Sequence, residues 1–357
     1  MTPSINDRMT LATTNPGHAP SPTGPRVVRV DDSLRPLAIA RLLGVRPGDS
    51  NVRTFIESSA REGDDLRQLW CTLSAAGRPV HALLAMASPG RTAMFFLSPD
   101  DALALHETGD RARLAGTPAI EERAALVAHA SGVLSGAIRE ATPPGALGLP
   151  KYAMAQALLE PSQPELVDSF LAGGFSRLAS LAYMRREIPR RALFEEPELP
   201  PGYSLVPLST LSEEDAEDSL IRSLELSYVE TLDCPELCRL RTTDDVIESH
   251  RSVGEYDPRL WFVLLRDGAP AGCMLLTVCP TQQMIELVYM GLAPMARGKG
   301  LATAMLRFGL NRLAGRSEKY LACAVDEANV PASRLYQSLR MKTFTRRIAL
   351  VRGLNNP

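Results

Sequence analysis

The chain contains an internal repeat of a predicted β-hairpin. Leu69-Trp70 is followed by CTLSAAGRPVHALLAM, and Leu260-Trp261 is followed by FVLLRDGAPAGCMLLT. The offset is 191 residues and holds without a gap over about 16 residues. In each copy two apolar runs flank a short Gly-x-Pro turn, which is typical of a β-hairpin. The shared Trp and Gly-x-Pro favour a duplication over the general likeness of any two α/β domains.

A second match lies near the end of each copy, at an offset of 166 residues. Residues 153–161 and 321–329 are strand-like runs, each followed by a short helical segment and a further apolar strand at 177–186 or 345–353. The smaller offset places about 25 extra residues in the first copy, within 99–150. This order of elements predicts an α/β (α+β) fold with two tandem domains, each a mixed, mostly antiparallel twisted sheet flanked by helices.

Composition changes along the chain suggest where these domains begin and end. Residues 1–25 are rich in Pro, Thr, Ser and Asn and poor in apolar residues, which predicts a disordered tail without a secretory signal. The first domain is expected at 26–188 and the second at 203–357. Residues 189–202 are Pro-rich and charged, as suits an exposed linker.

Charge and composition narrow the classes of partner. The net charge is −2 and aromatic residues make up 5%, so neither nucleic acid nor an anionic membrane is expected as a partner. No segment is long and apolar enough to span a bilayer. The six cysteines form no CxxC pair, so we expect reduced thiols, no metal site and a cytoplasmic location. Whether the protein is a monomer or a homodimer stays open.

A glycine-containing loop in the second copy predicts an anion-binding site. Residues 282–294 have the pattern of a strand running into Pro294, and the loop RGKGLA follows at 297–302. An amphipathic helix is expected next. Backbone N–H groups and the positive end of a helix dipole then point at one spot, and the glycines let a ligand approach closely.

The spacing in this loop excludes two common phosphate-binding motifs. A Walker A loop needs GxxxxGK[ST], whereas Lys299 is followed by Gly300 and the upstream spacing is wrong. A dinucleotide fingerprint starting at Gly298 needs Gly or Ala where Thr303 stands. The pattern that remains is [RQ]-x-x-G-x-[GA] after a strand ending in Leu-x-Pro.

At these residues the sequence resembles the GNAT (GCN5-related N-acetyltransferase) superfamily, in a tandem arrangement of two GNAT-like domains. Arg297, Gly300 and Ala302 fall on its acetyl-CoA loop pattern. The resemblance implies that backbone amides of the loop hold the CoA pyrophosphate, and that the preceding strand binds the thioester carbonyl and the pantetheine arm. The implied cofactor-binding residues are Met290, Gly291, Leu292, Arg297, Gly298, Lys299, Gly300, Leu301, Ala302 and Asn329.

Two further residues match catalytic positions of the superfamily. Asn329, Ala332 and Tyr336 fit its N-x-x-A-x-x-L-Y segment, which implies that Tyr336 protonates the departing thiolate. Where the family usually has Gly-Phe this chain has Arg340-Met341, a departure that affects a turn and a core position. Glu286 is spaced like the glutamate base of related histone acetyltransferases. It is either that base, with a pKa raised by partial burial, or a structural carboxylate at a strand start.

The segment that shapes the acceptor pocket in this superfamily corresponds here to residues 227–250. Tyr228, Asp233, Cys234 and His250 are its candidate lining residues, and the alternative for each is an ordinary surface position. Mixed charge in the segment does not select a substrate.

The first copy lacks the residues that carry this chemistry. Phe95 to Pro99 resembles the strand and the Leu-x-Pro, but no R-x-x-G-x-G follows. Phe170 aligns with Tyr336, and counting back from Leu-x-Pro aligns Arg91 with Glu286. We therefore expect a degenerate GNAT-like first domain with a structural role, or one that helps to frame the acceptor site.

The sequence thus predicts an acetyl-CoA-dependent N-acetyltransferase that acts on a primary amine by direct attack. A small-molecule acceptor is favoured slightly over a peptide, because no peptide-binding signature is visible. The alternative is a non-catalytic acyl-CoA-binding regulatory protein. A third interpretation, in which the loop binds another phosphate ligand, predicts no acetyl-CoA binding.

Overall fold

The computed structural model describes residues 26–354 except 64, 100–116, 139–151 and 197. The predicted disordered tail at 1–25 and most of the predicted insertion at 99–150 lie outside the described residues. Among the helices that are described, none has the length and apolar character needed to cross a bilayer.

Both halves of the chain have the same order of strands and helices. The first half holds β1 (Val27–Arg29), α1 (Arg35–Leu43), α2 (Ser50–Glu62), β2 (Leu69–Leu73), β3 (Pro79–Ser88), β4 (Thr92–Leu97), α3 (Thr117–Leu134), β5 (Met154–Leu159), α4 (Pro164–Ala172) and β6 (Ser176–Glu187). The second half holds β7 (Tyr203–Pro207), α5 (Glu213–Tyr228), α6 (Thr243–Arg251), β8 (Trp261–Arg266), β9 (Ala269–Cys279), β10 (Met284–Leu292), α7 (Leu301–Arg312), β11 (Tyr320–Asp326), α8 (Val330–Ser338) and β12 (Lys342–Gly353). Short 3-10 turns are η3 (Leu208–Thr210), η4 (Pro235–Arg239) and η5 (Pro294–Ala296). This mixed α/β architecture confirms the predicted fold class.

The two predicted hairpins are present. β2 pairs with β3 and β8 pairs with β9, both antiparallel. Gly77 and Gly268 occupy equivalent turn positions, with φ of 73° and 83°. Only glycine adopts these angles without strain, which explains why both turns keep it.

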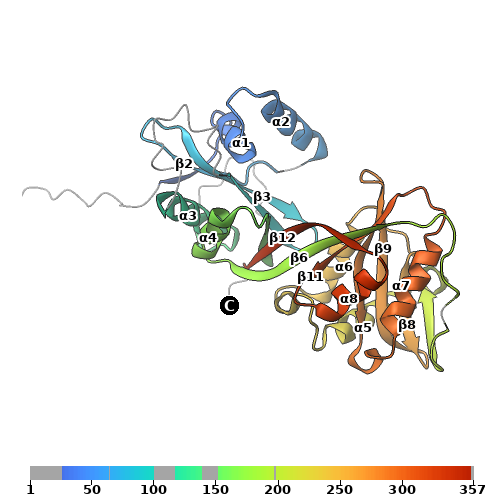
Figure 1. Cartoon of the computed structure of the whole chain (residues 1–357). Coiled ribbons are helices and arrows are strands. Elements are labelled where there is room, and N and C mark those ends of the chain that lie inside the picture. Colours follow the sequence, from blue (N-terminus) through green and yellow to red (C-terminus); the bar gives the residue numbers. More distant parts are fainter. Residues whose placement is uncertain (1–25, 64, 100–116, 139–151, 197, 355–357) are drawn as a thin grey trace, which may run out of the picture.

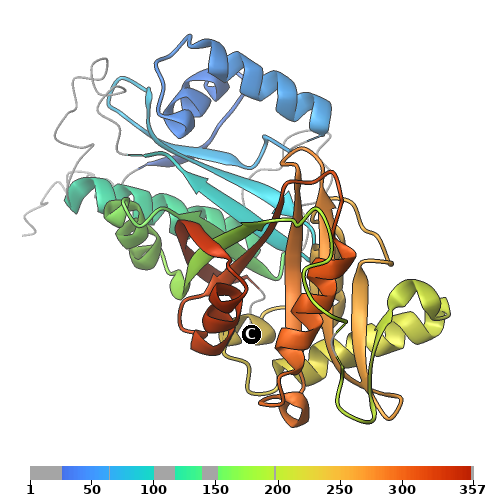
Figure 2. The same ribbon diagram turned by 45° about the vertical axis from the view of Figure 1, so that its right-hand side comes forward.

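The last strand of each half lies in the sheet of the other half. The sheet has 12 strands in the order β1-β2-β3-β4-β5-β12-β6-β11-β10-β9-β8-β7. β12 therefore pairs with β5 of the first half, and β6 pairs with β11 of the second half. Figures 1 and 2 show the green β6 and the dark red β12 side by side between the two halves. The two halves are thus joined by reciprocal strand exchange.

The pairing of the exchanged strands reflects the internal repeat. β6 and β12 run antiparallel from the pair Lys342↔Arg185 to the pair Val351↔Ser176. The two halves are related by an offset of 166 residues, and this offset converts each of these two pairs into the other. In the pair Leu181↔Arg347 the two residues are themselves 166 apart, so this pair corresponds to itself. An approximate twofold axis therefore passes through that pair.

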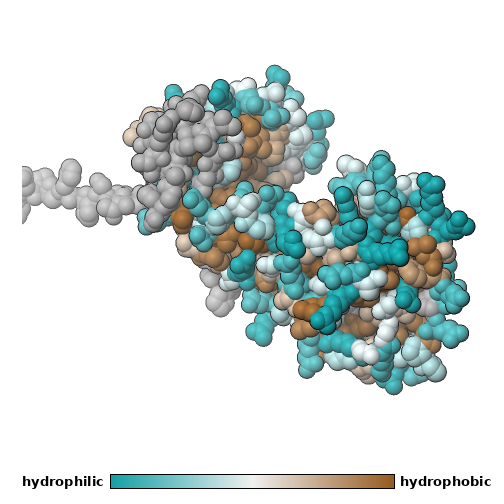
Figure 3. Space-filling view, viewed as in Figure 1, coloured by the Kyte–Doolittle hydropathy of each residue, from teal (hydrophilic) through white to brown (hydrophobic). Residues whose placement is uncertain are grey.

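Each exchanged strand is buried in the other half's core. Ile348 and Leu350 of β12 join the cluster formed by β3, β4, β5, α3 and α4. Ala182 and Met184 of β6 join the cluster between the second sheet and helices α7 and α8. Helices α5 and α6 cover the opposite face of that sheet, and α1 and α2 cover the corresponding face in the first half. In the view of Figure 3 the surface of the second half shows hydrophilic residues interspersed with apolar patches.

A second link between the halves is an ion pair. Arg91, in the β3–β4 turn, donates two hydrogen bonds of 2.8 Å to the carboxylate of Asp245 in α6. The Arg91 guanidinium holds the pKa of Asp245 well below its usual range. Gly90 lies against the backbone carbonyl of Asp245, so that a Cβ there would collide with it. This turn is therefore shaped to dock on α6.

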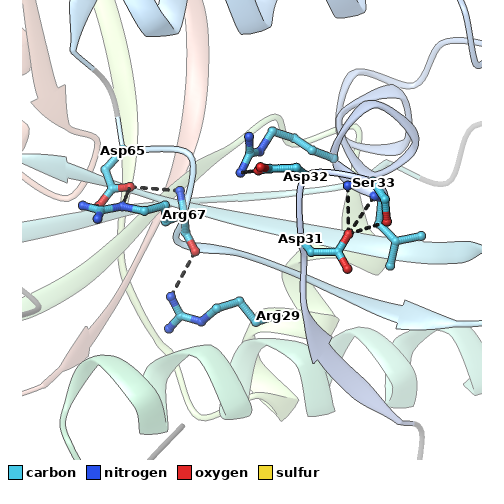
Figure 4. Close-up of polar contacts among 8 residues, drawn as sticks. Arg29, Asp31, Asp32, Ser33, Asp65 and Arg67 are labelled. Carbon is cyan, nitrogen blue, oxygen red and sulfur yellow. Dashed lines mark hydrogen bonds and ion pairs between the residues drawn. The ribbon is translucent and has the colours of Figure 1, made fainter. Parts of the chain in front are cut away.

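Local polar contacts hold the outer edge of the first half (Figure 4). Asp31 accepts hydrogen bonds from the amides of Ser33 and Leu34 just before α1. Asp65 and Arg67 form a close ion pair, and the carbonyl of Arg67 accepts a 3.0 Å hydrogen bond from Arg29 of β1. The Arg29 contact adds to the ladder between β1 and β2, far along the sheet from the second half.

The sheet order bears on the predicted division of the chain. A cut between 26–188 and 203–357 leaves each half without one strand of its own sheet. We retain these boundaries and the linker at 189–202 as a proposal about the chain's organisation.

Strand exchange predicts that a core mutation in the second half's last strand loosens the first half. Leu350→Ala removes a fully buried side chain and should cost about 2–5 kcal/mol of unfolding free energy. Hydrogen exchange should accelerate mainly in β3, β4 and β5. Met184→Ala in β6 is the matched variant and should accelerate exchange mainly in β10 and β11. If hydrogen exchange in Leu350→Ala became faster only in β8–β11, the result would contradict the strand swap between the two halves.

Candidate active site

The strands β10 and β11 pair at one end and then separate. Their parallel ladder runs from Met284↔Tyr320 to Glu286↔Ala322 and ends there. β10 nevertheless continues to Leu292, and its register against β9 shifts between Leu287 and Tyr289. The backbone of β10 beyond Glu286 is therefore open on the side of β11. An extended ligand arm could take up such backbone groups as an added strand does.

The predicted phosphate-binding loop lies at the end of this opening. Gly298 and Gly300 have φ of 73° and 76°, and Gly300 is the N-cap of α7. A Cβ at either glycine would meet no atom of the described chain within 4 Å, so space is free above both. No side chain caps α7, which leaves N–H groups of its first turn without an intrahelical partner. The loop thus has the features of an anion site at a helix N-terminus.

Arg297 anchors the loop through its side chain. Its guanidinium donates to the carbonyls of Leu292, Glu230, Ser227 and Val229 at 2.7–3.2 Å. Three of these carbonyls lie at the C-terminal end of α5, where a positive charge is favourable. The Arg297 amide itself donates to the carbonyl of Pro294 at 3.2 Å. Arg297 therefore shapes the loop, and the glycine-side amides are the ones left for a ligand.

The other predicted loop residues divide into exposed and buried positions. The Lys299 ammonium lies 3.4 Å from the Tyr203 hydroxyl of β7 and is exposed beside the loop. Leu301 is buried in the core and orients α7, while Ala302 is half-buried. Met290 and Leu292 pack against the same core, and Gly291 lies between them on β10.

Glu286 occupies the point at which β10 and β11 begin to separate. It is opposite Thr277 of β9 and Ala322 of β11, and it is half-buried. Burial raises the pKa of its carboxyl above the ordinary value. A base in this position would act at the inner end of the opening between the strands.

Tyr336 lies in α8 and packs in the core on the face of the sheet that α7 covers. Its side chain is 6% exposed, and burial raises the pKa of its phenol well above the ordinary value, with a further contribution from Cys323. Burial raises the pKa of Cys323, in β11, to about 12, and the charge of Glu286 adds to that shift. Cys323 thus lies within the electrostatic reach of both predicted catalytic residues.

Asn329 and Asp233 hold the end of β11. The Asn329 side-chain oxygen accepts a 3.2 Å hydrogen bond from Ala332 and caps α8. Asp233 accepts a 3.2 Å hydrogen bond from the amide of Asp326 and a further one from Asn329. Burial raises the pKa of Asp233. The cap gives Asn329 a structural role, and its predicted contact with the cofactor stays a prediction.

The remaining acceptor-pocket candidates cluster on Tyr289 of β10. The ring of Tyr228 meets Tyr289 edge-on at 5.6 Å, and His250 stacks on Tyr289 at the same centroid distance. Burial, together with the charge of Arg241, lowers the pKa of His250 to about 4, so its imidazole is neutral at pH 7. The structure places Asp233 at the end of β11. Tyr228 of α5 and His250 of α6 instead both pack against Tyr289. Cys234 is half-buried beside Asp233.

The equivalent positions of the first half carry apolar side chains. Helices α4 and α8 have bounds 166 residues apart, which confirms Phe170 as the counterpart of Tyr336. The alignment of Arg91 with Glu286 is wrong. The β4–β5 ladder pairs Met94 with Gln156, as Glu286 pairs with Ala322, so Met94 is the counterpart. Counting back from Leu-x-Pro fails because β10 has nine residues and β4 has six, so β10 has three more residues between the ladder and Leu-x-Pro, and its register shift is part of that difference.

Comparison with known proteins agrees with this geometry. A family model described as Acetyltransferase (GNAT) family matches residues 226–340, which include the opened strands, the loop and α8. Residues 226–340 belong to the GNAT family.

The chain is also similar to curated proteins. The mycothiol acetyltransferase of Frankia casuarinae is 29% identical over 188 residues, covering 49% of this chain and 52% of its own length. That of Thermobispora bispora is 29% identical over 180 residues, covering 49% and 58%. The chain spans about half the length of the curated relatives it matches.

The fold of the whole chain has a solved counterpart. A GCN5-related N-acetyltransferase from Sphaerobacter thermophilus aligns with a TM-score of 0.52 at 16% identity, covering 93% of this chain and 96% of that one. At this identity the likeness concerns the fold, and it extends over both halves. The GNAT domain therefore lies within a larger shared architecture.

The loop geometry generates a test with a matched control. Gly300→Ala places a methyl group in the free space at the N-terminus of α7 and should weaken acetyl-CoA binding at least about tenfold by calorimetry. Gly315→Ala just past the other end of α7 has the same φ of 76° and should leave the affinity unchanged. Both variants should lose a similar stability, about 1 kcal/mol. Equal affinity in the two variants would contradict the loop assignment.

Proposed function

We propose that the GNAT domain transfers the acetyl group of acetyl-CoA to a primary amine. The observation that carries this proposal is the opening between β10 and β11, which leads from the half-buried Glu286 to the free glycine loop at α7. The relatives named mycothiol acetyltransferase favour a small-molecule acceptor over a peptide. A cytoplasmic location and a monomeric or homodimeric state remain predictions.

The donor substrate fits the residues that are present. The amides of Gly298, Lys299 and Gly300 and the first turn of α7 would hold the pyrophosphate, because no side chain caps α7 and the space above the two glycines is free. The open backbone edge from Met290 to Leu292 would hold the pantetheine arm and the thioester carbonyl. An amide of that edge near Leu292 would also stabilise the oxyanion of the tetrahedral intermediate.

The chain's own groups supply the proton transfers of a direct attack. The neutral amine forms the new C–N bond at the thioester carbonyl and passes its proton to the Glu286 carboxylate, directly or through water. Collapse of the intermediate breaks the C–S bond, and the Tyr336 phenol gives its proton to the departing thiolate. The raised pKa of Glu286 makes its carboxylate a stronger base than an exposed one, and the Tyr336 phenol is protonated at pH 7 and so has a proton to give.

The alternative is an acyl-CoA-binding regulatory protein without turnover. In that case Glu286 and Tyr336 have structural roles only. An assay for free CoA thiol, run across a panel of small-molecule amines and peptides, separates the two functions. Acetyl-CoA binding by calorimetry without thiol release for any acceptor would favour the regulatory role.

The raised pKa of Glu286 predicts the acid limb of the pH profile. The base must be ionised, so kcat/KM should fall as the pH drops through a pKa above the ordinary glutamate value of about 4.3. Glu286→Gln should lower kcat by about 100-fold or more and remove this limb, with little change in acetyl-CoA affinity. A Gln variant that keeps the wild-type limb would show that another group is the base.

Tyr336→Phe tests the general acid. It removes only the hydroxyl and should lower kcat by about 100-fold, while the dissociation constant for acetyl-CoA changes little. Tyr152→Phe is the control, since Tyr152 is similarly buried but lies in the first half and bonds to Gln68. If both variants keep wild-type turnover, the role of Tyr336 is structural.

A further inference from the structure

The exchanged strand β6 brings a first-half tyrosine next to the candidate active site. β6 pairs with β11 over seven residues, and Tyr183 is directly opposite Ala324. Ala322, two residues earlier in β11, is directly opposite Glu286 of β10. Opposite residues, and residues two apart on one strand, share a face of the sheet. Glu286, Ala322, Ala324 and Tyr183 therefore lie on the same face.

The side chains between Glu286 and Tyr183 are small. β11 places only the methyl groups of Ala322 and Ala324 between the two, and Ala324 is exposed to solvent. The charge of Glu286 contributes, after burial, to a raised pKa of the Tyr183 phenol, in keeping with their proximity. Among the residues that the structure describes, none hydrogen-bonds to the Tyr183 hydroxyl. A polar group without a protein partner thus lies near the predicted base.

The equivalent site in the first half is arranged the other way round. The offset of 166 residues relates Ala322 and Ala324 to Gln156 and Leu158, and it relates Tyr183 to Ala349. β12 pairs Ala349 with Leu158 there. In the first half the small residue, Ala349, is on the exchanged strand β12, and the larger residues Gln156 and Leu158 are on β5. Met94 takes the place of Glu286. Only the second half combines a carboxylate, two alanines and a tyrosine.

The ring of Tyr183 is held in place by its neighbours. Phe344 of β12 meets it edge-on with centroids 6.4 Å apart. The Arg185 guanidinium lies 4.8 Å from the Phe344 ring and 4.6 Å from the Tyr320 ring, which orders the adjoining surface. An edge-on ring pair restrains the direction of the phenol without occupying its hydroxyl.

We infer that Tyr183 lines the acceptor side of the active site and orients the acceptor amine over Ala324, beside Glu286. The first half then completes the second half's site through the exchanged strand. The hydroxyl suits an acceptor that carries a hydrogen-bonding group close to its amine. This inference rests on the proposed acetyl transfer.

The test compares Tyr183→Phe and Tyr183→Ala with wild type on the full chain. A panel of amino alcohols and the corresponding simple alkylamines, ethanolamine and ethylamine among them, first identifies an accepted amine. For Tyr183→Phe we expect the KM for accepted amino alcohols to rise at least about fivefold, with kcat changed less than twofold and the acetyl-CoA dissociation constant unchanged. Tyr152→Phe is the control and should change none of these values.

Tyr183→Ala adds a readout that a purely structural role would not move. Loss of the ring lets water reach Glu286, which favours its charged form and lowers its pKa. The acid limb of kcat/KM should therefore shift to lower pH in Tyr183→Ala and stay in place in Tyr183→Phe.

The outcomes separate the two proposals. Wild-type KM values in Tyr183→Phe together with an unmoved acid limb in Tyr183→Ala, in an active enzyme, would overturn the role of Tyr183 and leave acetyl transfer standing. A wild-type protein that binds acetyl-CoA but acetylates no amine of the panel would remove the proposed function, and this inference with it.

Discussion

The pairing of β6 with β12 is the constraint on which the rest of the molecule depends. Each strand buries its side chains in the other half's core, so neither sheet is complete without the distant part of the chain. The ladder joins the halves into one 12-stranded sheet, and the Arg91–Asp245 ion pair adds a second contact. The first half therefore supplies a strand to the sheet of the GNAT domain, which gives it a structural role in that domain.

The candidate site follows from a local defect in that sheet. A register shift in β10 and the early end of its ladder with β11 leave backbone edges open, and the loop at Gly298 and Gly300 continues the opening to the start of α7. The first half keeps a continuous β3–β4 ladder and has Met94 and Phe170 at the chemical positions. The two halves share one architecture, yet only the second half has the candidate site, because it combines the register shift in β10 with the side chains of Glu286 and Tyr336.

Several predicted site residues make structural contacts with their side chains, and their predicted contacts with ligands stay predictions. The Arg297 side chain binds carbonyls at the end of α5, and the Asn329 side chain caps α8. Tyr228 and His250 pack on Tyr289. Such side chains determine the shape of the site, whereas the backbone amides and Glu286 face the opening.

The sequence by itself determined what local spacing controls: the repeat, the two hairpins, the Gly-rich loop ahead of α7, and the Phe170 counterpart of Tyr336. These features depend on turns, helix periodicity and residues close in the chain. The tertiary structure alone decided the strand exchange, the correct counterpart of Glu286 and the placement of Tyr183 opposite Ala324. These depend on pairing between strands that are separated in the chain, by 36 residues for Glu286 and Ala322 and by 141 for Tyr183 and Ala324, and such pairing leaves no signal in local residue spacing.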